Sequence, residues 1–191
     1  MKKGRPKRLL DQVGFKVCAL LEGRQRRALA TEYLFGDDAE SDADAFSLYA
    51  GLVHERMSYG EARGRIADAG MREDNQRCAL ALLDRLPEKR GKVEKVFIHL
   101  EKGTPPEQYD RFESLVAPVR GGLQLGLALF ALGLVDEDTV RQCREAIYTA
   151  SGTPDPELDA LIADAVGRRL ISPKKLGLLD SVLPISSRRK R

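Results

Sequence analysis

Apolar residues recur along most of this chain at intervals of three and four, which is the spacing of one face of an α-helix. The first such series consists of Leu9, Leu10, Val13, Val17, Leu20 and Leu21. It predicts a helix that begins at residue 9 and bends or ends at Gly23. A second helix is expected across 24–35, with Leu29, Tyr33 and Leu34 turned inward.

Capping residues mark where the later helices begin. Ser58 with Glu61 three residues later forms a capping box, and Gly70 is typical of a helix end. Thr104, Asp155 and Ser172 each stand next to a proline, which is a signature of a helix start. The expected helices cover 45–56, 58–69, 72–86, 106–116, 120–134, 136–150, 156–169 and 173–182.

The segment 93–100 is ambiguous. Val96, Ile98 and Leu100 alternate as in a β-strand. No other segment offers a convincing strand partner, and an isolated strand is not stable. We therefore interpret 93–100 as a helix or as an isolated extended piece.

Together these patterns predict an all-α fold, a multi-helix bundle of eight to ten helices. The bundle forms either one domain or two small helical subdomains that divide near 37–45 or 87–105. Along the chain we expect a basic arm (1–8), N-terminal helices (9–36), an acidic linker (37–45), a helical domain (46–184) and a basic tail (185–191). The residues expected to be buried are Leu80, Leu83, Leu125, Leu129, Leu132, Ile147, Leu161 and Val166.

Charge is distributed unevenly along the 191 residues. Of 32 Lys and Arg residues, nine lie in 1–8 and 188–191, where there is no Asp or Glu. The rest of the chain has 23 basic and 29 acidic residues and therefore a net charge of −6. A mildly acidic body with cationic ends is expected to meet polyanions through its termini.

The N-terminal arm carries a known type of sequence. It reads Lys2, Lys3, Gly4, Arg5, Pro6, Lys7 and Arg8. This segment resembles the AT-hook, a short peptide built on Arg-Gly-Arg-Pro that binds the DNA minor groove. The resemblance covers about seven residues, with Lys3 in place of the first arginine, and implies that Gly4, Arg5 and Pro6 lie along a narrow minor groove. The alternatives are a solubilising tail or a targeting signal.

Two further segments could contact DNA. The tail ends in Arg188, Arg189, Lys190 and Arg191, which could bind phosphates, address a nucleus or only solubilise the chain. The segment 58–86 has the outline of a helix-turn-helix, and Arg72, Asn75, Gln76 and Arg77 stand where a recognition helix begins. Glu73 and Asp74 in the same turn would repel phosphate, so simple helix packing is the alternative.

Candidates for other chemistry are weak. Cys18, Cys78 and Cys143 form no disulfide or zinc pattern and are expected to be buried, unpaired and poorly reactive. His54 and His99 have no partners at a telling spacing. We expect no metal, no cofactor and no catalytic residues. No secretory signal is apparent, and the apolar stretch 123–135 is too short to span a bilayer.

We therefore expect a non-enzymatic DNA-binding or DNA-associated protein with a regulatory or accessory role. It would be cytoplasmic and nucleoid-associated, or nuclear in a eukaryote, and it would contact DNA through its basic termini. The alternative is a helical protein–protein adaptor or inhibitor whose tails only solubilise it. A protein partner is compatible with both hypotheses, and the sequence indicates no membrane association and no particular oligomeric state.

Overall fold

The structure is a computed structural model that describes residues 7–54, 57–152, 155–180 and 183, with the side chains of 7–11 and 151 left aside. The chain divides after Pro118 into two compact units, unit 1 (1–118) and unit 2 (119–191). The two segments considered as boundaries from the sequence, 37–45 and 87–105, both lie inside unit 1. Each unit is considered by itself.

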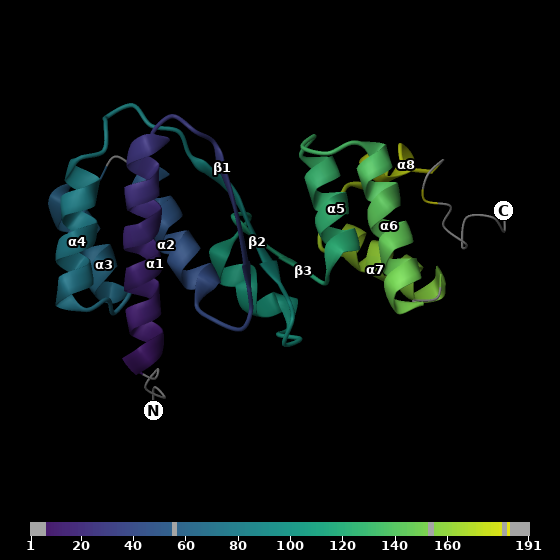
Figure 1. The fold of residues 1–191 in the computed structure, drawn as a ribbon, viewed down its shortest axis with the longest axis horizontal. Helices are drawn as coiled ribbons and strands as arrows, with labels where there is room; N and C mark the ends of the chain where they lie inside the picture. Colours follow the sequence, from purple (N-terminus) through teal and green to yellow (C-terminus); the bar gives the residue numbers. More distant parts are fainter. Residues whose placement is uncertain (1–6, 55–56, 153–154, 181–182, 184–191) are drawn as a thin grey trace. The chain divides into compact units, whose positions relative to one another are not determined.

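Unit 1 combines helices with a small parallel sheet (Figure 1). The sheet has three strands in the order β1-β2-β3. The elements of unit 1 in chain order are α1 (Lys7–Arg26), β1 (Glu32–Asp37), α2 (Asp42–His54), α3 (Tyr59–Asp68), α4 (Glu73–Asp84), β2 (Val93–His99), the 3-10 helix η1 (Pro106–Phe112) and β3 (Val116–Val119), whose last residue lies beyond the division. Helices α2, α3 and α4 form the crossover between β1 and β2.

The all-α prediction is therefore wrong, because the expected helix over 24–35 ends early and its second half is a strand. Helix α1 stops at Arg26, and Glu32–Asp37 becomes β1. Strand β1 pairs with β2 in parallel, with Phe35 opposite Phe97, and their two rings stack with centroids 5.4 Å apart. The segment 93–100 is thus mostly strand, and its partner is the segment that helical periodicity had assigned to a helix.

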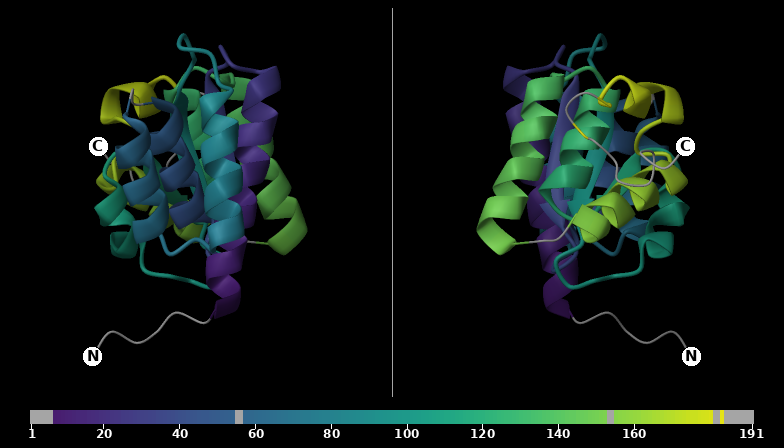
Figure 2. Two further views of the ribbon diagram at one scale, coloured as in Figure 1. Left: turned by 90° about the vertical axis from the view of Figure 1, so that its left-hand side faces the viewer. Right: turned by 90° about the vertical axis from the view of Figure 1, so that its right-hand side faces the viewer.

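The helices of unit 1 gather on one face of the sheet (Figures 1 and 2). Helix α1 packs against α2 and α4, and α2 packs against β1 and β2. Val96 and Ile98 of β2 are fully buried in the core that the sheet shares with these helices. That core also contains Val17 and Leu21 of α1 and Tyr49 of α2.

A buried charged cluster joins α1, β1 and α2. The guanidinium of Arg24 is fully buried, and its Nη1 lies 3.0 Å from Oε2 of Glu32, which is 8% exposed. Nη1 also donates to the carbonyl oxygen of Ala30 at 2.8 Å. The hydroxyl of Tyr49 donates to Glu32 as well, and Arg27 pairs with the other carboxylate oxygen at 3.0 Å. Glu32, the first residue of β1, therefore connects the end of α1 to Tyr49 of α2.

Unit 2 contains only helices after the end of β3, among the residues that the structure describes. They are α5 (Gly122–Ala131), α6 (Glu137–Ser151), α7 (Asp155–Gly167) and α8 (Pro173–Gly177). The side chains of Asp136 and Ser172 cap α6 and α8 by accepting hydrogen bonds from backbone N–H groups. The helix starts that we predicted in this half are therefore close to those of the structure.

The predicted core is correct in part. Leu80 is buried, and most of the other predicted positions are partly buried. Leu132 is 40% exposed, because it follows α5 at its C-terminal end and lies outside the helix. All three cysteines are unpaired, but Cys78 is exposed, so its predicted burial is wrong. On α4 the inward face passes through Ala79 and Leu80 instead.

Candidate functional site

The structure leaves most of the predicted terminal contacts untested. Lys2, Lys3, Gly4, Arg5 and Pro6 lie outside the described residues, as do Arg188, Arg189, Lys190 and Arg191. Lys7 and Arg8 form the first residues of α1, although their side chains are not among those described. The arm therefore runs directly into a helix that belongs to the core of unit 1.

The helix-turn-helix outline corresponds to a real pair of packed helices. Ser58 caps α3, and its capping box with Glu61 is complete in both directions. Gly70 adopts a left-handed φ of 72° in the turn, which glycine tolerates better than other residues. Helix α4 then begins at Glu73 and packs against both α3 and α1.

Two of the four predicted base-reading residues make contacts inside the fold. Asn75 lies against Gly14 of α1, where a Cβ would approach its side-chain nitrogen to 2.5 Å. Gln76 donates its side-chain N–H to the carbonyl oxygen of Met71 at 2.7 Å. Arg72 and Arg77 are exposed, and Arg77 pairs with Asp74 one turn away. Of the four predicted residues, Arg72 and Arg77 are therefore the two whose side chains are exposed.

The carboxyl edge of the sheet carries a second concentration of polar groups, which we call the acidic edge (37–44). Strand β1 ends at Asp37, and α2 begins at Asp42. The Nζ of Lys16, which projects from α1, pairs with the carboxylates of Glu40 and Asp42. Burial acts to lower the pKa of Lys16, but the hydrogen bonds to Asp42 and Glu40 outweigh it and raise the pKa above its ordinary value.

Asp38 ties the acidic edge to the loop that follows β2. Its carboxylate accepts hydrogen bonds from the backbone N–H groups of Lys102 at 2.8 Å and Thr104 at 3.0 Å. Burial acts to raise the pKa of Asp38, but these hydrogen bonds outweigh it and hold the pKa below its ordinary value. Asp42 in turn accepts a hydrogen bond from the backbone N–H of Asp37 at 3.1 Å. The carboxylates thus hold two loops together at one end of the sheet.

Ser41 is the unusual member of the acidic edge. The residue is 6% exposed, and its hydroxyl oxygen has no hydrogen-bond partner among the described residues. A buried hydroxyl in that state costs free energy unless something satisfies it. Within the described ranges, no three His, Cys, Asp or Glu side chains are grouped so that they could hold a metal ion by themselves.

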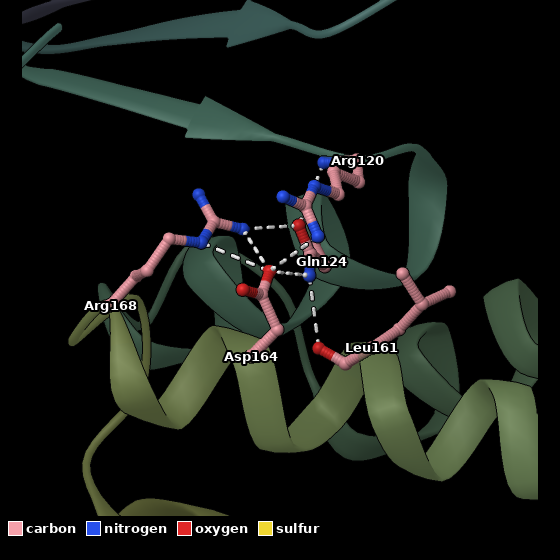
Figure 3. Close-up of polar contacts among 5 residues, drawn as sticks. All are labelled: Arg120, Gln124, Leu161, Asp164 and Arg168. Atoms are coloured by element: carbon pink, nitrogen blue, oxygen red, sulfur yellow. Dashed lines mark hydrogen bonds and ion pairs between the residues drawn. The ribbon is translucent and has the colours of Figure 1, made fainter. Parts of the chain in front are cut away.

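Unit 2 has one elaborate polar network, which Figure 3 shows. Gln124 of α5 is fully buried, and its side-chain nitrogen donates to the carbonyl oxygen of Leu161 at 2.9 Å and to Asp164 at 2.8 Å. Its side-chain oxygen accepts hydrogen bonds from the backbone N–H of Arg120 at 2.7 Å and from the guanidinium of Arg168 at 2.6 Å. The side-chain amide of Gln124 therefore donates two hydrogen bonds and accepts two. Through them it connects α5 to α7.

The two arginines of this network differ in their exposure. Arg168 pairs with Asp164 at 2.7 Å, and its side chain is 18% exposed. Arg120 reaches the same carboxylate only at 3.8 Å, and its side chain is 48% exposed. Arg168 is therefore held inside unit 2, whereas Arg120 offers a partly open positive charge next to the turn at Gly121 that precedes α5.

Sequence reasoning missed both the acidic edge and the network around Gln124. Repulsion among its carboxylates predicts a linker over 37–45, but Lys16 of α1 neutralises two of them. The order of residues in this segment does carry a signal for a site. Tyr33 and Phe35 are followed directly by Gly36 and acidic residues, an order that fits the carboxyl end of a parallel strand. Gln124 gave no signal of its own, because one polar residue in an apolar helix has no pattern.

Comparisons of the chain with protein-family models, with curated proteins and with solved structures find no match. Across the described part of the chain, no helix has both the length and the apolar character needed to cross a membrane.

Proposed function

We propose that this protein binds DNA in a regulatory or accessory role and holds the duplex through its cationic ends. The observation that supports the proposal is the separation of charge, with nine basic and no acidic residues in 1–8 and 188–191 and a net charge of −6 elsewhere. Contacts between such residues and phosphates supply most of non-specific DNA affinity. The acidic body confines this attraction to the ends.

The helix that follows the arm supports a defined role for it. Helix α1 begins at Lys7 and buries Val13, Val17 and Leu21 in the core of unit 1. A cation placed just before this helix is tied to a folded body, so DNA bound by the arm would be held close to unit 1. In the proposal Arg5 enters the minor groove between Gly4 and Pro6, while Arg8 reaches phosphate only.

The surface arginines of the helix-turn-helix pair offer an additional contact. Arg72 and Arg77 are exposed near the start of α4, and Asn75 and Gln76 hold the helix in place behind them. The nearby carboxylates of Glu73 and Asp74 oppose phosphate. We therefore assign these arginines a secondary role, in which they add phosphate contacts and do not read bases.

The division of roles in the arm can be tested with single substitutions in the full chain. We expect Arg5→Ala to weaken binding to AT-rich duplexes more than to GC-rich ones, because a narrow minor groove attracts inserted arginine. Arg8→Ala should weaken binding to both duplexes alike. The matched control is Lys89→Ala, which removes an exposed cation from the turn after α4 and should leave both affinities unchanged. Equal losses from Arg5→Ala on both duplexes would refute the minor-groove role.

A second candidate function is the binding of Mg²⁺ with a phosphorylated ligand at the acidic edge. Two observations favour it. Ligands of open parallel sheets bind outside the carboxyl ends of the strands, which is where Asp37 and Asp38 lie. The buried hydroxyl of Ser41 also lacks a partner there. Mg²⁺ commonly uses only one or two carboxylates and completes its shell with waters and phosphate oxygens, so the absence of a three-residue cage is compatible with it.

The second candidate is tested by thermal unfolding with Mg²⁺ alone, inorganic pyrophosphate alone and both together. We expect only the combination to raise the unfolding temperature, and Ser41→Ala should reduce that rise. Ser47→Ala is the control, because this helix α2 residue also has a buried hydroxyl without a described partner but lies outside the acidic edge. No change with the combination would eliminate the second candidate and would leave the DNA proposal untouched.

A further inference from the structure

Helices α1 and α4 approach each other closely in unit 1 (Figures 1 and 2). At Gly14 of α1 a Cβ would lie 2.5 Å from the side-chain nitrogen of Asn75 of α4, so only glycine leaves room there. One helical turn further along each helix stand Cys18 and Cys78. The absence of a side chain at Gly14 therefore brings the two cysteines together.

The thiol of Cys18 reaches α4 one turn before Cys78. Cys18 donates a hydrogen bond from Sγ to the carbonyl oxygen of Asn75, with 3.4 Å between the atoms. Asn75 and Cys78 are three residues apart in α4, so Cys78 is the next residue along the same side of that helix. Both cysteines are free in the structure, and they differ in exposure, since Cys78 is exposed and Cys18 is partly buried.

We propose that Cys18 and Cys78 form a reversible disulfide when the protein meets a peroxide. The pair is thus a modification site that crosslinks α1 to α4. The chemistry needs an exposed sulfur that a peroxide can reach and a second sulfur beside it that replaces the oxygen, and the structure places one of each here. Cys143 belongs to unit 2 and has neither property, because it is partly buried and packs against Gly126.

The reaction has two steps. First, the Cys78 thiolate attacks the peroxide; an S–O bond forms as the O–O bond breaks, and the departing hydroxide takes up a proton to become water. Second, the sulfur of Cys18 attacks the sulfenic acid of Cys78; the S–S bond forms as the S–O bond breaks, and a second water leaves with the Cys18 proton. The two sulfurs together lose two electrons, and hydrogen peroxide gains them.

The environment of Cys18 sets the order of these steps. Burial, the hydrogen bond to Cys78 and the charge on Cys78 raise the pKa of Cys18 to about 12. Cys18 therefore keeps its proton, and Cys78 is the exposed sulfur that a peroxide reaches first. Once Cys78 has become a sulfenic acid, Cys18 supplies the second sulfur and completes the bond.

The crosslink would act on the helix that carries the basic arm. Helix α1 begins at Lys7, and Cys18 lies in its second half. A bond to α4 closes the chain between residues 18 and 78 and lowers the entropy of the unfolded state. The oxidised protein is therefore expected to unfold at a higher temperature than the reduced protein.

The test treats the reduced full-length protein with a small excess of hydrogen peroxide, blocks free thiols and maps its peptides without reduction. We expect a peptide pair that joins Cys18 to Cys78 and weighs two hydrogens less than its parts, with Cys143 alkylated as a free thiol. Reductant should reverse the linkage. Mapping needs no variant, so a folding defect cannot obscure the result.

Three variants make the assignment sharper. Cys143→Ser should form the crosslink as the wild type does, whereas Cys78→Ser should form none and lose the rise in unfolding temperature on oxidation. Cys18→Ser should stop at the sulfenic acid of Cys78, which a dimedone-type probe captures. The proposal is overturned if the wild type gives that trapped sulfenic acid, or Cys78-linked dimers, without any Cys18–Cys78 peptide.

Discussion

Replacing Glu32 with alanine removes the carboxylate that holds the buried guanidinium of Arg24. Arg24 is fully buried, and its Nε and Nη2 have no hydrogen-bond partner among the described residues, so Glu32 and the carbonyl of Ala30 are its described support. Tyr49 loses its hydrogen-bond acceptor in the same substitution. We therefore expect a large loss of stability in unit 1.

The magnitude follows from the burial of the pair. Removing one partner of a buried ion pair costs about 3–5 kcal/mol, because the other charge stays buried without compensation. Glu94→Ala provides a matched control at the second residue of β2. Glu94 pairs with Lys92 at 2.5 Å, with the two side chains 33% and 51% exposed, and a surface pair of this kind contributes about 0–1 kcal/mol. Both variants lose one negative charge at the beginning of a strand.

The free energy of unfolding should be measured by urea titration and followed by near-ultraviolet circular dichroism. The chain has no tryptophan and five tyrosines, of which four lie in unit 1 at positions 33, 49, 59 and 109, so the signal reports chiefly on that unit. A loss for Glu32→Ala no larger than that for Glu94→Ala would refute the reasoning. It would mean that Arg24 reaches water or another partner once the carboxylate is gone.

Three further substitutions test the acidic edge, α3 and the network of unit 2. Gly36→Ala should cost about 1–3 kcal/mol, since its Cβ would lie 2.3 Å from the carboxylate of Asp42, and urea titration measures this loss. Gly64→Ala, which meets nothing within 4 Å inside α3, should instead stabilise by about 0.5–1 kcal/mol. Burial acts to raise the pKa of Asp164, but hydrogen bonds from Arg168 and Gln124 outweigh it and lower the pKa. The contribution of Asp164 to the stability of the folded protein is therefore complete above the unfolded pKa of about 4. It is lost as the pH falls through the lower pKa of the folded state. Thermal unfolding of Asp164→Asn between pH 2 and 7 should lack that acid-sensitive part, and the same pH dependence as the wild type would contradict this.

Helices were predictable where their signals are local. Ser58 and Ser172 cap helices as predicted, because a cap depends on only three or four neighbouring residues, whereas Pro105 and not Thr104 precedes η1. The predicted helix over 120–134 is also present as α5 (Gly122–Ala131), shorter at both ends. These elements can be identified without knowledge of what they pack against.

The sheet was not predictable in this way, because its strands stabilise each other across a long separation in sequence. Leu34 pairs with Val96 and Phe35 with Phe97, and neither strand shows its partner in its own residues. The β2 segment alternates clearly, but alternation alone predicts no partner. The segment at Tyr33 also fits a helical repeat, and tertiary pairing decides against it.

The candidate sites were partly hidden for the same reason. The acidic edge depends on Lys16, which reaches it from α1, and the cysteine pair depends on Gly14, which lets α1 and α4 approach. Apolar periodicity placed Cys78 among inward positions, although a one-residue rotation on α4 moves it to the surface while Ala79 is buried. The terminal cations, by contrast, are visible in sequence alone, because charge needs no partner to be recognised.

The central proposal, that the cationic ends hold DNA, is tested most directly by the salt dependence of binding. We would titrate one duplex with the wild type and with a full-length variant in which the nine terminal Lys and Arg residues are glutamine. Each phosphate contact contributes about 0.9 to the slope of log K against log salt. We predict a steep slope for the wild type and almost no binding by the variant. Undiminished binding by the variant would move the site to Arg72 and Arg77, and no binding by the wild type at low salt would contradict the DNA proposal and favour the protein adaptor.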